Sequence, residues 1–127
     1  MPSKQRFTVI PRRFNACIYA AELSNGFVKV GFSRNPRTRM ESLNGQVKRR
    51  FGTAVVRWHI SRDFTNVRQG FQVESLLIRR MNAIGARVPG TTEFFHGVSF
   101  DVAAGLIEQI APLCDNTADA RNSVAKA

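Results

Sequence analysis

The strongest constraint on the fold of this chain is a pair of short apolar runs on either side of a turn sequence. Residues 16–23 (ACIYAAEL) and 27–31 (FVKVG) flank Ser24-Asn25-Gly26. An Asn-Gly step between two such runs is a strong short-range signal for a β-hairpin. We therefore expect the folded part of the chain to open with two antiparallel strands.

The turn also predicts which residues face each other across the hairpin. If it closes on the residues that flank it directly, Tyr19 lies opposite Gly31 and Lys29 lies opposite Ala21. Side chains alternate between the two faces of a strand, so these four share one face. That face carries a phenol, an ammonium group and, at Gly31, a gap for a ligand. The opposite face supplies apolar residues for the core.

A helix is expected directly after the hairpin. Asn35 followed by Pro36 is typical of a helix start, because asparagine caps the first turn and proline fits the first helical position. Apolar residues then recur at helical spacing at Met40, Leu43 and Val47. The pattern predicts about three turns.

The rest of the chain predicts one more strand and two more helices. Residues 53–60 (TAVVRWHI) have the β-branched and aromatic content of a strand. An apolar stripe from Val73 to Ile84 predicts a second helix, and a last helix covers about 101–111 and stops at Pro112. The segment between these two helices is expected to be loop.

These elements predict a single α+β domain with a small central antiparallel or mixed three-stranded sheet flanked by helices. With 127 residues and 43% hydrophobic content, the chain has enough apolar surface for one core. The domain is expected to cover residues 15–112. A basic N-terminal arm, 1–14, precedes it, and a flexible C-terminal tail, 113–127, follows it.

The charge favours a polyanionic partner. Nineteen Lys and Arg against nine Asp and Glu give a net charge of +10, which indicates nucleic acid first. No apolar run approaches the roughly 20 residues that span a membrane. The N-terminus has no secretion signal, so a cytoplasmic location is expected. Two scattered cysteines, Cys17 and Cys114, and two histidines make no zinc cluster, and no disulfide is expected.

A phosphate site is predicted between the hairpin and the first helix. Arg37 and Arg39 fall in the first helical turn, where free N–H groups favour anions. Tyr19 and Lys29 are diagonal neighbours whose long side chains reach one common ligand. Charged runs often only face water, but the net charge favours phosphate contacts. The residues predicted to bind nucleic acid are Arg34, Arg37, Lys48, Arg49 and Arg50.

Two triplets and one arginine resemble the GIY-YIG nuclease family. The triplets are Cys17-Ile18-Tyr19 and Lys29-Val30-Gly31, and Arg39 follows eight residues after that glycine. The chain looks like the small phage and bacterial branch in which KIG or KVG replaces the second triplet. The family's metal-binding glutamate on a later helix matches Glu74. The similarity covers roughly residues 15–111.

The same branch has a Glu-aromatic-Phe element that Glu93-Phe94-Phe95 resembles. A structural role for Glu93, capping the loop, fits the sequence as readily as a catalytic one. His59 in the third strand fits either proton transfer or a half-buried, satisfied polar group.

The resemblance implies a metal-dependent endonuclease that hydrolyses DNA phosphodiester bonds, of phage, mobile-element or bacterial origin. Tyr19 would be the general base that takes a proton from water, and Lys29 nearby would lower the pKa of its phenol. Arg39 would stabilise the transition state. Glu74 would bind Mg²⁺ or Mn²⁺ against the leaving 3′ oxygen. The products would carry a 5′ phosphate and a 3′ hydroxyl.

The chain departs from the family pattern in ways that leave other functions open. Cys17 replaces the first glycine, Lys29 replaces the second tyrosine, and Ile78 stands where some relatives have histidine. The alternative is a catalytically inactive nucleic-acid-binding or regulatory module. A third reading, an RNA-binding accessory domain, lacks an aromatic RNA-binding signature, so DNA is favoured over RNA. No separate DNA-reading domain is visible, which leaves room for a partner protein that supplies targeting.

Overall fold

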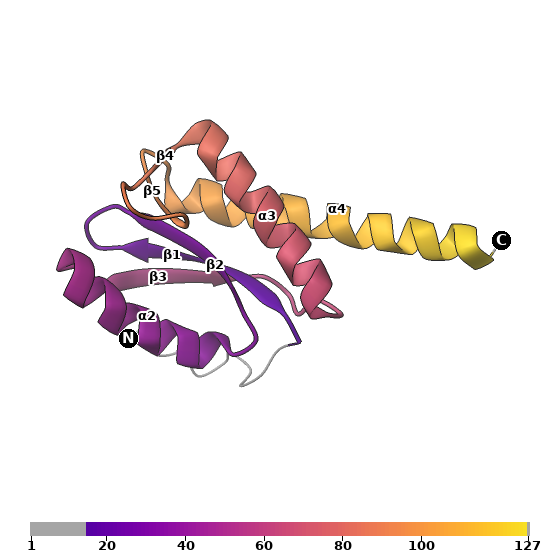
Figure 1. The fold of residues 1–127 in the computed structure, drawn as a ribbon, viewed down its shortest axis with the longest axis horizontal. Helices are drawn as coiled ribbons and strands as arrows, with labels where there is room; N and C mark the ends of the chain where they lie inside the picture. The colour runs from indigo at the N-terminus through magenta and orange to yellow at the C-terminus, as the bar shows by residue number, and fades with distance from the viewer. Residues whose placement is uncertain (1–14, 127) are drawn as a thin grey trace.

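The computed structural model describes residues 15–126, with only the backbone described for 114–126, so the basic arm predicted for 1–14 lies outside it. Within this range the elements follow in the order β1, β2, α2, β3, α3, β4, β5, α4 (Figure 1). Strands and helices pack against each other in one unit. The predicted α+β class is therefore confirmed.

All the strands of this region belong to one antiparallel sheet, in the order β3-β1-β2-β5-β4. The strands are β1 Cys17–Leu23, β2 Val28–Ser33, β3 Val55–Ile60, β4 Ala86–Arg87 and β5 Phe94–His96. The prediction of a three-stranded sheet is wrong, because β4 and β5 come from a segment expected to be loop. With two and three residues, they are too short for an alternation of apolar and polar residues to be visible in the sequence.

The hairpin has the predicted register. Tyr19 pairs with Gly31, and Ala21 pairs with Lys29. The turn closes on its flanking residues, with Gly26 at a φ of 92° that favours glycine. The local sequence was enough here because turn chemistry fixes hairpin register.

Helix α2, Pro36–Phe51, begins as expected and ends later than expected. The Asn35 side chain accepts a hydrogen bond from the Thr38 backbone N–H at 3.2 Å. The basic run of residues 48–50 was expected to follow the helix, but it forms the last helical turn, before Gly52. Cations are favoured there because the C-terminal end of a helix carries partial negative charge.

The other two helices are α3, Val67–Ile84, and α4, Phe100–Lys126. The expectation that the last helix stops at Pro112 is wrong for the backbone, because α4 continues past Pro112. The flexibility expected for residues 113–127 stays a prediction. An internal proline removes one helical hydrogen bond, but a helix already nucleated by packing can extend beyond it. Figure 1 shows the C-terminal half of α4 projecting past the sheet. No helix in residues 15–126 has the length and apolar character needed to cross a bilayer.

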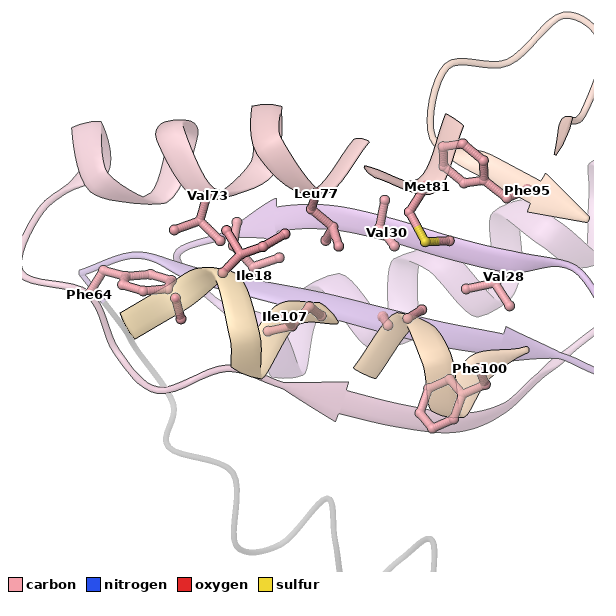
Figure 2. Packing of buried hydrophobic residues seen from close by; sticks show 14 of the residues in the cluster. Ile18, Val28, Val30, Phe64, Val73, Leu77, Met81, Phe95, Phe100 and Ile107 are labelled. Carbon is pink, nitrogen blue, oxygen red and sulfur yellow. The ribbon is translucent and has the colours of Figure 1, made fainter. Parts of the chain in front are cut away.

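One face of the sheet packs against α3 and α4 in an apolar core. Ile18, Val28 and Val30 of the hairpin meet Leu77 of α3 and Ile107 of α4, and all five are at most 1% exposed (Figure 2). This is the face that the hairpin register predicted to be the core.

The other face of the sheet is covered by α2 and forms a second core. Leu43 and Val47 of α2 pack with Tyr19 and Trp58 of the sheet. Tyr19 is 1% exposed and Lys29 is 2% exposed. Both side chains are covered because α2 lies across this face, which the hairpin sequence alone did not predict.

Candidate functional site

A side-chain hydrogen bond joins β1 to α2 at the centre of the predicted site. Arg39 Nε donates to the phenol oxygen of Tyr19 at 3.1 Å. The phenol lies over Gly31, where a Cβ atom would come within 2.6 Å of its oxygen. The predicted gap at Gly31 thus holds the end of the Tyr19 ring itself, and no space for a ligand remains at that point.

Burial sets the protonation of this phenol. Desolvation raises the pKa of Tyr19, and the charge and hydrogen bond of Arg39 lower it only in part. The ring of Trp58 packs against it with centroids 5.0 Å apart, and the Trp58 indole N–H has no hydrogen-bond partner among the described residues. The predicted lowering of the phenol pKa by Lys29 is wrong: Lys29 Nζ lies 5.8 Å from the ring centre, but Arg39 is the cation that lowers the pKa, and burial outweighs it.

Lys29 forms an ion pair with Glu93 rather than a contact with the Tyr19 phenol oxygen. Its Nζ donates to Glu93 Oε1 at 2.8 Å and to the backbone oxygen of Val30 at 3.0 Å. Burial lowers the pKa of Lys29, while the hydrogen bond and charge of Glu93 raise it. The pairing of Lys29 with Phe94 across β2 and β5 brings Glu93 to this point. A buried ammonium needs such a partner, because an unpaired buried charge is costly.

Glu93 also contacts Glu74, on α3. Burial and, after it, a hydrogen bond with the Glu93 carboxyl group raise the pKa of Glu74 to about 7. The charge of Lys29 and a hydrogen bond from the backbone N–H of Phe32 lower it in part. The Glu74 carboxyl group therefore keeps its proton up to near neutral pH.

The structure thus brings the four predicted catalytic side chains, Tyr19, Lys29, Arg39 and Glu74, into one neighbourhood. Glu93 connects Lys29 and Glu74, and the pKa of Tyr19 responds to the charges of Arg39, Glu93 and Glu74. We call these five residues the polar network. Their chemical roles stay predictions, because proximity alone assigns none.

A hollow of about 210 Å³ adjoins the polar network. One wall of the hollow consists of Arg39, Gln46 and Arg50 of α2. The rest of the lining consists of residues 90–94 and Lys29. Gln46 and the loop residues were missed in the sequence. The spacing of 39, 46 and 50 along one helical face was the signal that could have indicated them.

The predicted nucleic-acid-binding residues divide between the two ends of α2. Arg34 and Arg37 lie at its start, and Lys48, Arg49 and Arg50 form its last turn. Of these five, only Arg50 lines the hollow. Arg34, Lys48 and Arg49 are exposed elsewhere on the surface.

Two other side chains considered from the sequence lie outside the polar network. His59 Nε2 is 2.7 Å from Glu108 Oε2 of α4. His59 pairs with Ala20, next to Tyr19 along β1, so its side chain lies on the opposite face of the sheet from the Tyr19 phenol. Cys17 is fully buried, and burial raises the pKa of its thiol to about 12. A neutral, buried thiol fits packing rather than nucleophilic chemistry.

The carboxyl pair fits a divalent cation that arrives with a phosphate. The described side chains hold no cluster of three or more His, Cys, Asp or Glu that could bind a metal alone. Mg²⁺ is commonly bound by one or two carboxylates together with substrate phosphates and water. Glu74 and Glu93 are the two described side chains that could supply such carboxylates, because Glu93 lies close enough to raise the pKa of Glu74.

Comparison with known proteins assigns the family. The model of the T5orf172 domain matches residues 16–111, so the chain belongs to that family. The GIY-YIG assignment drawn from the sequence is therefore wrong. It rested on short triplets around a hairpin, and the residues at 17 and 29 depart from them. Neither the curated proteins nor the solved structures gave a significant match.

Proposed function

We propose that this member of the T5orf172 domain family hydrolyses phosphodiester bonds of nucleic acid, with DNA as its substrate. The observation that carries the proposal is the Tyr19–Arg39 hydrogen bond beside the Glu74–Glu93 carboxyl pair, next to a hollow lined by arginine. The net charge of +10 supports a polyanionic substrate.

Arg39 is assigned to the phosphate. Tyr19 occupies its Nε, and the terminal nitrogens of the guanidinium are left for phosphate oxygens. A guanidinium fork matches phosphate geometry and stabilises the negative charge that grows on it during hydrolysis. The hydrogen bond to Tyr19 fixes the fork in place before the substrate arrives.

Tyr19 is assigned to proton transfer. Its phenolate form would take a proton from the water whose oxygen bonds to phosphorus while the bond to the 3′ oxygen breaks. Because burial raises the pKa of Tyr19, the phenol is neutral at neutral pH. The rate is therefore expected to rise as the pH rises.

Glu74 and Glu93 are the residues that would hold Mg²⁺ or Mn²⁺. Such a cation supplies Lewis-acid stabilisation of the phosphate and of the leaving oxygen. Lys29 is a positioning residue, because it holds the Glu93 carboxylate at 2.8 Å. In the absence of a cation, a proton shared by the two carboxyl groups limits their repulsion.

A nucleic-acid-binding module without turnover is the second candidate. The burial of Tyr19, 1% exposed, favours it, because a general base must reach the water that it deprotonates. Both candidates require the same basic surface, so binding alone does not separate them.

The test is nicking of supercoiled plasmid with Mg²⁺, Mn²⁺ or EDTA. Arg39→Ala and Glu74→Gln are expected to lower the rate by about a hundredfold or more. The matched control is Arg79→Ala, which removes an exposed arginine of α3 and should cut normally. Cleavage that persists in both site variants would contradict the proposal. DNA binding without cleavage by the wild type would favour the module.

RNA is compared with DNA as a competitor at several salt concentrations, because a chain of this charge binds any polyanion at low salt. Preferential cleavage of RNA would indicate a ribonuclease instead of a DNA endonuclease.

A further inference from the structure

The hollow follows one face of α2 away from the polar network. Arg39, Gln46 and Arg50 are seven and four residues apart, which places them on the same side of the helix. About three helical turns separate the Cα atoms of Arg39 and Arg50, but both side chains line the same hollow of about 210 Å³. Of these two arginines, only Arg39 belongs to the polar network.

Arg50 is held in place although it is exposed. Its Nη2 donates to the backbone oxygen of Gly90 at 3.0 Å. Its guanidinium carbon lies 5.2 Å from the ring centre of Phe51 and 6.0 Å from that of Phe94. Within the described part of the chain no carboxylate pairs with it. Its position is fixed, its charge is not neutralised, and four of its five N–H donors remain for a ligand.

The opposite wall of the hollow is a braced loop. Val88 N–H donates to Phe94 O at 2.9 Å, and Thr91 Oγ1 donates to Val88 O at 2.7 Å. Gly90 has a φ of 79°, a conformation that other residues rarely adopt. These contacts hold the Gly90 carbonyl that accepts from Arg50, so the hollow is formed in the absence of a ligand.

We infer that this hollow is a second phosphate subsite, which binds the phosphate and sugar next to the phosphodiester held by Arg39, with Arg50 as its cation. The inference rests on the proposed phosphate binding at Arg39. A volume of about 210 Å³ is below the roughly 300–1,000 Å³ of sites that enclose whole small-molecule ligands, so the hollow suits one backbone unit. Phe94 is buried and Arg50 lies over its ring, which leaves it unavailable to stack a base. Contacts of this kind position a strand without reading its sequence.

The test compares short oligonucleotides that carry one or two phosphates. The ligands are TpT, TpTpT, and TpTpT with one phosphate replaced by a neutral methylphosphonate, titrated by NMR in EDTA. For the wild type, we expect the second phosphate to raise affinity about tenfold, at the lower end for a charge-assisted hydrogen bond. The methylphosphonate ligand should lose this gain.

Arg50→Ala should reduce the gain to about the twofold statistical advantage of a second phosphate, and Arg50→Lys should keep part of it. The matched control is Arg79→Ala, which removes an exposed arginine of α3 that does not line the hollow. Its gain should equal that of the wild type. The amide spectra of all variants show whether the fold is retained, which an exposed position should allow.

A full gain in Arg50→Ala, or an equal loss in Arg79→Ala, would overturn the subsite. Since the titrations contain EDTA and need no turnover, they are independent of the plasmid assay. A protein that shows the predicted gain but never nicks DNA keeps the subsite and loses the proposed enzyme. A protein that nicks DNA without the gain keeps the enzyme and loses the subsite.

Discussion

The two faces of the sheet bury similar kinds of hydrophobic residue, but only one of them also buries charge. The core under α3 and α4 consists of aliphatic and aromatic side chains. The core under α2 shares its space with Lys29, 2% exposed, and with the phenol of Tyr19. Charges taken out of water destabilise a fold unless they are paired. We infer that the α3/α4 face supplies stability and that the α2 face gives up part of its stability to hold the polar network.

The largest expected effect comes from a cavity on the apolar face. Ile107→Ala, in α4 and fully buried, should lower the free energy of unfolding by about 3 kcal/mol, measured by urea denaturation. Because α4 contributes no residue to the polar network, the folded variant should bind DNA as the wild type does. A loss of DNA affinity in the folded variant would contradict the assignment of stability to one face of the sheet and of ligand binding to the other.

Gly31→Ala tests how tightly the other face is packed. The new Cβ would meet the Tyr19 phenol at 2.6 Å, while Trp58 and Arg39 hold the ring. We expect a loss of about 2 kcal/mol in thermal or urea unfolding, and loss of nicking.

The matched control is Gly105→Ala in α4, where a Cβ meets nothing within 4 Å. It should raise stability by about 0.5–1 kcal/mol, because alanine favours a helix. If both variants behaved alike, the close approach of Tyr19 to Gly31 would be of no consequence.

The carboxyl pair predicts a pH dependence of stability. The folded protein holds the Glu74 proton up to a pH of about 7, whereas the ordinary pKa is 4.5. Between these values only the unfolded chain loses the proton, so the free energy of unfolding should fall as the pH rises. The full shift would correspond to about 3 kcal/mol. Solvent screening of this half-buried group reduces the expected effect to about 1 kcal/mol.

Urea unfolding at pH 5 and pH 8 measures this slope, and Glu74→Gln should flatten it. Mg²⁺ should restore stability at pH 8 in the wild type and not in the variant. Parallel pH curves for the two proteins would show that the carboxyl groups do not share a proton.

The smallest expected change in stability is that of Tyr19→Phe. It removes the phenol oxygen that accepts from Arg39 Nε but leaves the buried ring, so unfolding should shift by no more than about 1 kcal/mol. Nicking should nevertheless be lost if the phenol moves the proton. A variant that unfolds like the wild type and still cuts would assign Tyr19 to packing alone.

The features that the sequence predicted correctly were local. The register of the hairpin follows from a three-residue turn, and the start of α2 follows from Asn35 and Pro36. The strands β4 and β5 were not visible in the sequence, because β5 is held by pairing with β2 across more than 60 residues and β4 pairs with β5 in turn. For the same reason the Lys29–Glu93 pair, 64 residues apart, was not predicted as a contact.

Four side chains of the polar network were named from the sequence, but their environment was not. The direction of the Tyr19 pKa shift was wrong because nothing in the hairpin shows that α2 will cover it. Glu93 fitted two roles equally well until its contact with Glu74 was seen. The triplets that suggested the wrong family encode a hairpin, and hairpins are shared by many folds.

Because β1 lies inside the sheet, we expect Tyr19 and Glu93 of the polar network to exchange their amide protons on different timescales. Tyr19 lies on a strand that is hydrogen-bonded on both sides, so its amide should exchange with solvent only when the whole domain unfolds. Glu93 lies just before a strand of only three residues, so we expect its amide to exchange faster than that of Tyr19. Any local opening of this segment would move the carboxylate while the phenol stays in place.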